Sequence, residues 1–469
     1  MMATTNGGYV FEGGFPTPDT VKRAYDDADR NRAIQAYRFF FPTVSALAIF
    51  DGNEAIGVLS NRSFGVLDTT PEQVGFTLNS DTPYGPMVLD LRDGPMVIEV
   101  PPGPLICAVF DLNQRWVADM GVPGPDAGEG GKHLLLPPGW KGEAPDGYYV
   151  WQATTNRLLG GVRSLPLQGD VQGANERITT LKVYPLDPSS DWQEPSWQNL
   201  SDKPQDTTPL AWETNIEFWR KLHEVIDTEP HLDSFGPLYG ELAALGIAKG
   251  TPFAPNAQTI KVLEEAARIA NGQMRVQAFA DRRADRVVWA GTQWEWAALR
   301  FENGDFEGDG YLDTDAREKW FFQAIGASPA MFRRESGAGS LYWLGLRDSK
   351  GTYLKGENAY TLTVPQPVPG KLFWSITVYD TETRSQIQTD QDNAALRSMF
   401  ELATAPTDAP ITLYFGPNAP EGYEERWIKT IPGKGWFVYF RIYGPEQPAF
   451  DGSWRLPDFE VAQYHERRP

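Results

Sequence analysis

The sequence predicts a mainly β protein with α segments, in which a helical connector joins two antiparallel β-sandwich domains. Short apolar runs bounded by Gly, Pro, Asn and Asp fall into two groups, which predict the strands of the two domains. Apolar residues at helical spacing precede the first group and separate it from the second. We therefore expect an N-terminal helical segment over 1–45, a first sandwich over 46–187, a linker and helical connector over 188–290, and a second sandwich over 291–469.

The first expected element is an amphipathic helix over residues 17–41. Thr17, Pro18 and Asp19 favour a helix start, since threonine caps the first turn and proline is tolerated there. After Pro42 the pattern changes to short apolar runs, so we expect the helix to end there. The expected strands of the first domain are residues 75–78, 87–91, 96–100, 105–110, 148–152 and 178–184.

The connector begins with a polar, proline-rich stretch over 187–208, which predicts an exposed linker without strands. Thr208 and Pro209 then predict the start of a helix that runs to about residue 227. Two further helices are expected over 236–245 and 256–285.

Strands return after residue 287. Residues 373–379 alternate large apolar with small polar side chains, which is typical of a strand with one buried face. The expected strands of the second domain are residues 341–346, 352–354, 360–364, 372–379, 411–415 and 435–443.

The charge balance disfavours two classes of partner. The chain has 42 Lys+Arg against 62 Asp+Glu, a net charge of −20, which repels phosphate backbones and anionic membrane surfaces. We expect no nucleic acid and no membrane partner.

The first twenty residues of the chain show no secretory signal, so the cytoplasm is favoured, while a periplasmic or secreted location stays open if a leader was removed. The single cysteine, Cys107, lies in an apolar run and is expected to be a buried, inert thiol.

Several motifs carry a resemblance to a known family. The run TLNSDTPY over 77–84, followed by VLDL over 88–91, resembles the N-terminal domain of the tandem "domain of unknown function" 1254/1214 family. Further motifs that resemble this family are PGW (138–140), TTN (154–156), LKVYPL (181–186), LGI (245–247), FWS (373–375), RIY (441–443) and DGSW (451–454). The resemblance implies two jelly-roll-like β-sandwiches joined by a helical segment, in a homo-oligomer. It implies no particular reaction.

The strongest chemical candidate is the polar cluster from Asn79 to Tyr84. A carboxylate flanked by amide, hydroxyl and phenol groups is suited to acid/base work, so we predict Asp81 as the acid/base, with Asn79 and Tyr84 orienting it or the substrate. The alternative is that this stretch only forms an Asx-type turn.

Asp380 is a second candidate, because it ends the strand over 373–379 and would form a carboxylate pair with Asp81 if the two sandwiches pack edge to edge. The competing interpretation is that a strand-end aspartate forms a turn. The side chains predicted to bind the substrate are those of Trp140, Asn156, Trp374 and Tyr379.

No metal site and no cofactor are expected. The four histidines are scattered, and no phosphate-binding loop or GxSxG motif is present. The acidic run from Asp305 to Asp315 begins like a calcium loop with Gly310 at the sixth position. Its twelfth position is Ala316 where a bidentate Glu is needed, so a solvated acidic loop is favoured and calcium binding stays open.

Together these features predict a soluble enzyme, a metal-independent hydrolase or lyase. It would carry out acid/base hydrolysis or elimination on a small neutral or cationic organic molecule, aromatic or sugar-like, in an aromatic-lined cleft. The alternative is a non-catalytic homo-oligomeric jelly-roll scaffold or carbohydrate-binding protein, in which the polar cluster is only a turn.

Overall fold

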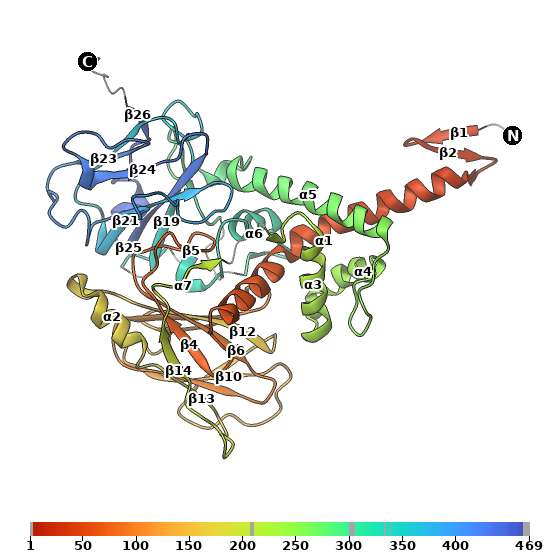
Figure 1. The fold of residues 1–469 in the computed structure, drawn as a ribbon, viewed down its shortest axis with the longest axis horizontal. Helices are drawn as coiled ribbons and strands as arrows, with labels where there is room; N and C mark the ends of the chain where they lie inside the picture. The colour runs from red at the N-terminus through yellow and green to blue at the C-terminus, as the bar shows by residue number, and fades with distance from the viewer. Residues whose placement is uncertain (1–2, 207–210, 300–304, 333, 338, 463–469) are drawn as a thin grey trace.

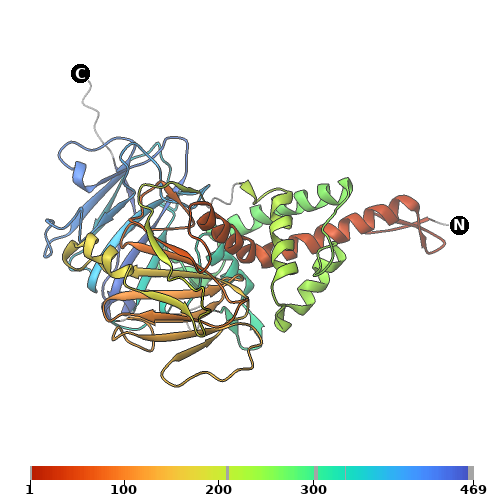
Figure 2. The same ribbon diagram turned by 60° about the horizontal axis from the view of Figure 1, so that its bottom comes forward.

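The computed structural model describes residues 3–206, 211–299, 305–332, 334–337 and 339–462. It is a mixed α/β fold with many antiparallel sheets and a long N-terminal helix. Two β-rich regions lie together at one end of the molecule, and a group of helices extends away from them toward the N-terminus (Figures 1 and 2).

The long helix α1 spans Pro18–Ala55, 38 residues. The expected start is confirmed, with Thr17 as the N-cap, but the expected end near Pro42 is wrong because the helix continues through this proline. Side chains on both sides of Pro42, such as Phe41 and Val44, are fully buried, and this packing outweighs the loss of one backbone donor. By length and composition α1 is apolar enough to cross a membrane, yet 72% of its most apolar window is buried inside the protein, as in a core helix.

A small sheet that the sequence did not suggest precedes α1. Its strands are β1 (Ala3–Asn6), β2 (Tyr9–Glu12) and β3 (Phe15–Pro16). This sheet and the first turns of α1 project from the rest of the molecule (Figures 1 and 2).

The first β region consists of two four-stranded sheets, in the orders β11-β10-β7-β13 and β6-β12-β8-β9. Their strands are β6 (Tyr84–Asp90), β7 (Met96–Val100), β8 (Leu105–Asp111), β9 (Trp116–Gly121), β10 (Gly131–Leu136), β11 (Tyr149–Gln152), β12 (Arg157–Ser164) and β13 (Lys182–Pro185). Side chains from both sheets, including Ile98 and Cys107, form one hydrophobic core. The buried thiol of Cys107 is thereby confirmed.

Four of the six strands expected here are confirmed, and two are not as predicted. Residues 75–78 follow the two-residue strand β5 (Gln73–Val74) and form no strand themselves. Ile178 ends the helix α2 (Val171–Ile178), so β13 begins only at Lys182.

The stretch over 187–208 is not free of strands. There β14 (Ser196–Asn199) pairs in parallel with β4 (Ser63–Val66), and β15 (Gln205–Asp206) pairs with β5. The ring of Trp197 lies 5.4 Å from that of Phe64, so an aromatic contact holds this polar segment to the sheet edge.

Three helices pack around the buried half of α1. They are α3 (Ile216–Thr228), α4 (Gly236–Ala244) and α5 (Ala257–Phe279). All three expected connector helices are therefore present. The predicted start at Thr208 and Pro209 lies outside the described residues, and α3 is capped by Asn215.

The second β region contains a five-stranded sheet, β16-β19-β25-β21-β22, and a four-stranded sheet, β24-β23-β20-β26. Their strands are β16 (Trp294–Trp296), β19 (Ser340–Gly345), β20 (Tyr360–Val364), β21 (Gly370–Asp380), β22 (Ala395–Arg397), β23 (Ile411–Gly416), β24 (Trp427–Lys429), β25 (Trp436–Pro445) and β26 (Glu460–Val461). Five of the six expected strands are confirmed, while 352–354 form only an isolated bridge. The remaining elements of this half are β17 (Glu307–Gly308), β18 (Tyr311–Leu312), α6 (Thr314–Phe321), α7 (Pro329–Phe332) and α8 (Pro448–Asp451).

The strand β21 departs from its sequence pattern in one respect that positions the site. Its small polar residues Ser375 and Thr377 are as fully buried as its apolar residue Ile376, so both faces of the strand are covered. The polar face is covered because it lies against the first β region: Ser375 donates a hydrogen bond to Asp81. At this strand the two β regions therefore meet through a polar contact.

Candidate functional site

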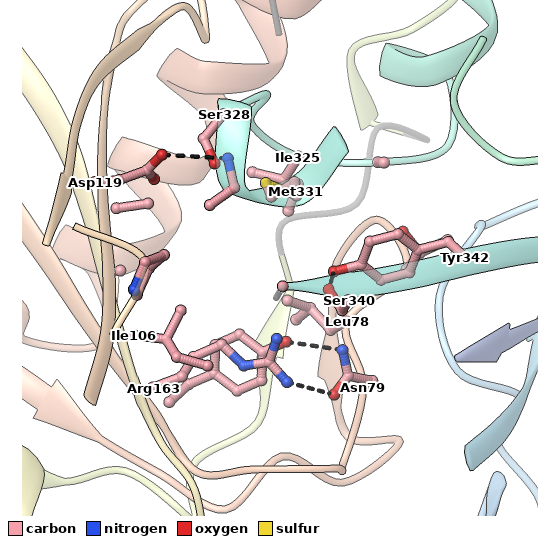
Figure 3. A pocket seen from close by; sticks show the side chains of 18 of the residues that line it. Leu78, Asn79, Ile106, Asp119, Arg163, Ile325, Ser328, Met331, Ser340 and Tyr342 are labelled. Atoms are coloured by element: carbon pink, nitrogen blue, oxygen red, sulfur yellow. Dashed lines mark hydrogen bonds between the residues drawn. The ribbon is translucent and has the colours of Figure 1, made fainter. Parts of the chain in front are cut away.

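A cavity of about 550 Å³ lies where the two β regions meet. One wall is the outer face of the sheet that contains β6, β8 and β12, and the other is formed by β19, β25 and the segment from Trp320 to Met331 (Figure 3). The side chains that line it are predominantly apolar and include Leu78, Pro86, Ile106, Phe110, Leu159, Ile325 and Met331. A concave, mostly apolar space with a few polar groups is the usual form of a small-molecule site.

Arg163, from β12, organises the polar end of this cavity. Its Nε donates to the Thr82 hydroxyl at 2.7 Å, and its Nη2 donates to Asn79 Oδ1 at 3.0 Å and to the Tyr443 hydroxyl at 3.2 Å. The guanidinium carbon also lies 4.7 Å from the centre of the Tyr84 ring. Figure 3 shows Arg163 and Asn79 facing each other at this end.

The predicted acid, Asp81, is completely buried and lies behind the cavity wall. Its Oδ2 accepts hydrogen bonds from Ser375 and Tyr443, both at 2.8 Å. Its Oδ1 has no hydrogen-bond partner among the described residues. Asp81 is therefore connected to the cavity by its hydrogen bond with Tyr443, whose side chain lines the cavity.

The hydrogen bonds of Asn79 fix the direction of its amide. Its Oδ1 accepts from the Asp81 backbone N–H at 3.1 Å and from Arg163, so its Nδ2 is the group 3.0 Å from the Tyr84 hydroxyl. Tyr84 is thus an acceptor in that bond, and its own proton has no acceptor among the described residues. The bond from Asp81 N–H to Asn79 also forms the expected Asx-type turn, which here presents side chains to the cavity.

A second arginine, Arg441 from β25, lines the same cavity and is buried. It donates from Nη1 to Thr377 Oγ1 at 3.1 Å and from Nη2 to the Tyr379 hydroxyl at 2.8 Å. Its Nε is buried without a hydrogen-bond partner among the described residues. Within the described part of the chain, neither Arg163 nor Arg441 forms an ion pair.

Burial controls the protonation of the surrounding phenols. It raises the pKa of Tyr84 and of Tyr443, and Asp81 raises both further, while the neighbouring Arg163 and Arg441 act in the opposite direction. Burial also lowers the pKa of both arginines, but the tyrosines around them, and for Arg441 also Asp81, raise it by more. At neutral pH the site therefore holds protonated phenols and charged guanidinium groups.

The opposite end of the cavity carries Asp119, from β9. Its Oδ2 accepts from the Ala330 backbone N–H at 3.3 Å, and the adjacent Ser328 hydroxyl is buried without a hydrogen-bond partner among the described residues (Figure 3). Sequence reasoning did not select Asp119, Arg163, Arg441 or Tyr443. A usable signal was present for Arg441, which is the only charged residue inside the apolar run 435–443.

The other predicted site residues lie away from the cavity lining. Trp374 is in the core of the second β region, stacked on Phe440, and Tyr379 lies behind the wall, where it donates to the Leu78 carbonyl at 2.9 Å. Asp380 forms the expected turn and pairs with Lys434 at 2.8 Å.

Asn156 and Trp140 lie at the periphery of the first β region. The Asn156 backbone N–H donates to Glu229 at 2.6 Å, and Trp140 occupies the turn after β10. Neither side chain is among those that form the cavity wall.

No group of three or more His, Cys, Asp or Glu residues suited to a metal ion occurs in the described ranges. The acidic run that begins like a calcium loop forms the hairpin β17–β18, and its Asp313 caps α6 and pairs with Arg283 at 2.8 Å. The carboxylate of Asp313 is thus engaged by the protein itself.

Comparisons with known proteins agree with the motifs. Residues 63–185 match the DUF1254 family and residues 339–447 match the DUF1214 family, each described as a protein of unknown function. No curated protein matches this chain. Among solved structures, the VPA0106 protein from Vibrio parahaemolyticus aligns with a TM-score of 0.58 at 17% identity, covering 93% of this chain and 100% of its own, which shows a shared fold. An uncharacterised protein from Burkholderia cenocepacia aligns with a TM-score of 0.43 at 12% identity, covering 95% of this chain and 97% of its own.

Proposed function

We propose that this chain, which carries a DUF1254 domain followed by a DUF1214 domain, is an enzyme that performs acid/base hydrolysis or elimination on a small organic molecule held between the two domains. The observation that carries the proposal is the chain of contacts from Asp81 through Tyr443 to Arg163 at the polar end of an apolar cavity. A base, an acid and a fixed positive charge are then available at one place.

Tyr443 and Asp81 act as the base. Tyr443 already donates its proton to Asp81 Oδ2, so its oxygen can take a proton from the substrate while the phenol proton passes to the carboxylate. Arg163, which donates to the Tyr443 oxygen, stabilises negative charge that develops there. After the transfer Tyr443 is a neutral phenol again and Asp81 is a neutral carboxylic acid.

Tyr84 acts as the acid. Because its oxygen accepts from Asn79, its proton is free to be donated to a leaving group or to an oxyanion in the cavity. The guanidinium of Arg163 above the Tyr84 ring stabilises the phenolate that results. One proton has then moved from Tyr84 to Asp81 over the cycle, and it returns through solvent when the product leaves.

The test replaces the phenol of Tyr84 while keeping its ring. Once a screen of esters, amides and β-hydroxy acids has identified a turnover, Tyr84→Phe is expected to lower kcat by about 100-fold or more. Asp81→Asn is expected to lower kcat as well, since it removes the final proton acceptor. The matched control is Tyr25→Phe, because Tyr25 is 68% exposed on the projecting part of α1. Full turnover in both Tyr84→Phe and Asp81→Asn would refute the mechanism.

Two finer points of architecture belong to this proposal. We infer that each β region is a jelly-roll-like sandwich, which is supported by the shared hydrophobic core of its two sheets. The expected homo-oligomer and the absence of nucleic-acid and membrane partners stay predictions.

The alternative function is a non-catalytic oligomeric scaffold. It is favoured by the projecting N-terminal sheet, where Phe15 is 78% exposed and available to a second copy. Light scattering and the turnover test together separate the two cases. The scaffold is supported if the unmodified protein is an oligomer without turnover and the Phe15→Ser variant is a monomer.

A further inference from the structure

We propose that the ligand of this cavity is a monocarboxylate with an apolar body, bound with its carboxylate at the end formed by Arg163 and Arg441. The location of the site rests on the proposed function, whereas binding of the carboxylate is measurable without any turnover. The sequence predicted a neutral or cationic substrate, and the charges at the site favour an anion instead.

The charges at the polar end favour an anion. Arg163 and Arg441 bring two positive charges to the cavity lining, and the carboxyl group that bonds to a phenol there is that of Asp81. Two other buried cations of this protein have a carboxylate of their own, since Lys319 contacts Glu295 at 2.6 Å and Arg384 forms an ion pair with Glu213, whereas the buried Arg317 donates to the Phe39 carbonyl. The two cavity arginines are bound by neutral groups instead.

A buried, unsatisfied cation also lies at this end. The Nε–H of Arg441 is buried without an acceptor among the described residues, although an unsatisfied buried charged donor is costly. A carboxylate beside the guanidinium compensates its positive charge through two acceptor oxygens.

The rest of the cavity lining determines which carboxylates can bind. Its walls are apolar side chains such as Ile106, Phe110 and Met331, which favour an aliphatic or aromatic body. Burying a second carboxylate against these apolar walls would cost free energy, because they cannot replace its hydration. The cavity therefore selects monocarboxylates over dicarboxylates.

Calorimetric titration with four ligands of equal chain length tests this selectivity on the unmodified protein. Octanoate is expected to bind at least about tenfold more tightly than octanamide, octylamine or octanedioate, because only octanoate pairs its one negative charge with the arginines and buries no second charge. Equal or tighter binding of octylamine or octanamide would overturn the proposal. Failure of both octanoate and 3-phenylpropanoate to bind at their highest soluble concentrations would overturn it as well.

Variants then locate the carboxylate. Arg163→Gln is expected to weaken octanoate binding by at least about tenfold, whereas Arg163→Lys, which keeps the charge, is expected to retain part of the affinity. The control Arg220→Gln, which changes an exposed arginine on α3 that pairs with Glu217, leaves the affinity unchanged. An Arg163→Gln protein that is folded by circular dichroism and binds octanoate normally would contradict the assignment.

These results are separable from the test of the enzyme. If octanoate shows no selectivity while Tyr84→Phe abolishes turnover, the enzyme proposal stands and the ligand class is wrong. If octanoate is selected and Tyr84→Phe turns over normally, the ligand class stands and the mechanism is wrong.

Discussion

The Tyr443 hydroxyl donates a hydrogen bond to the Asp81 carboxylate at 2.8 Å, although the two residues are 362 positions apart. Asp81 precedes β6 in the first β region, and Tyr443 lies in β25 of the second. The polar end of the cavity therefore exists only when the two regions are docked, so the same contact contributes to both stability and the proposed chemistry.

Tyr443→Phe is expected to destabilise the protein by about 1–3 kcal/mol. The change removes one of the two hydrogen bonds to a fully buried carboxylate and leaves that acceptor less well satisfied. Urea unfolding followed by fluorescence measures the loss. Tyr149→Phe, at a partly exposed ring in β11, is the control and should change the stability by less than about 0.5 kcal/mol. Equal stabilities of Tyr443→Phe and the unmodified protein would show that the bond contributes nothing.

Stability is expected to fall at alkaline pH. Burial raises the pKa of Tyr84 and Tyr443 in the folded protein above the value of about 10 that tyrosine has in an unfolded chain. Above about pH 10 the folded state keeps the two phenol protons while the unfolded state loses them. The contribution of the two phenols to the free energy of unfolding is therefore complete below about pH 10, and it declines as the pH rises through their higher pKa values in the folded protein. Melting temperatures between about pH 8 and 11 check this, and the decline should be shallower in Tyr443→Phe.

A buried histidine predicts a loss of stability in acid. His133, in β10, is fully buried; burial lowers its pKa, although the nearby Asp126 at 3.3 Å opposes the shift. Below about pH 6.5 the unfolded state takes up a proton that the folded state resists, so stability is lost as the pH falls. His133→Asn is expected to be less stable than the unmodified protein at pH 8 but to lose less stability between about pH 7 and 5. An identical pH dependence for both proteins would exclude His133 as the cause.

The buried ion pair between Arg384 and Glu213 is expected to be critical for domain docking. Arg384 is fully buried between the rings of Phe76 and Phe322, and its pairing with Glu213 links the second β region to the segment before α3. Glu213→Gln leaves the guanidinium charge without a partner, which costs about 3–5 kcal/mol.

The exposed pair of Glu217 with Arg220 gives the matched control, because Glu217→Gln should cost less than about 1 kcal/mol. Denaturant unfolding measures both variants. If the two changes have similar effects, the buried pair is not a determinant of docking.

The sequence predicted those strands well whose pattern depends only on neighbouring residues. The strand over 96–100 and the strand over 360–364 match β7 and β20 at both ends, because each is an apolar run between turn residues. The end of α1 was misjudged, since Pro42 is a local signal while the packing of Phe41 and Val44 that carries the helix past it is not.

The candidate site was predictable only in part. The polar cluster at Asn79, Asp81 and Tyr84 is visible because its members are close together in the chain, and Asn79 and Tyr84 line one end of the cavity while Asp81 lies behind its wall. Their partners Arg163 and Tyr443 come from distant strands and could not be assigned by spacing.

The amino-acid order alone determined nine of the twelve expected strands, most of the helices and the turn that carries Asp81, because these depend on periodicity and on residues close together in the chain. Only the tertiary structure decided that the polar face of β21 is buried, and that Ser375 and Tyr443 meet Asp81 across the boundary between the two β regions. That outcome depends on how two sheets pack against each other, and the free energy of this packing comes from contacts between residues hundreds of positions apart.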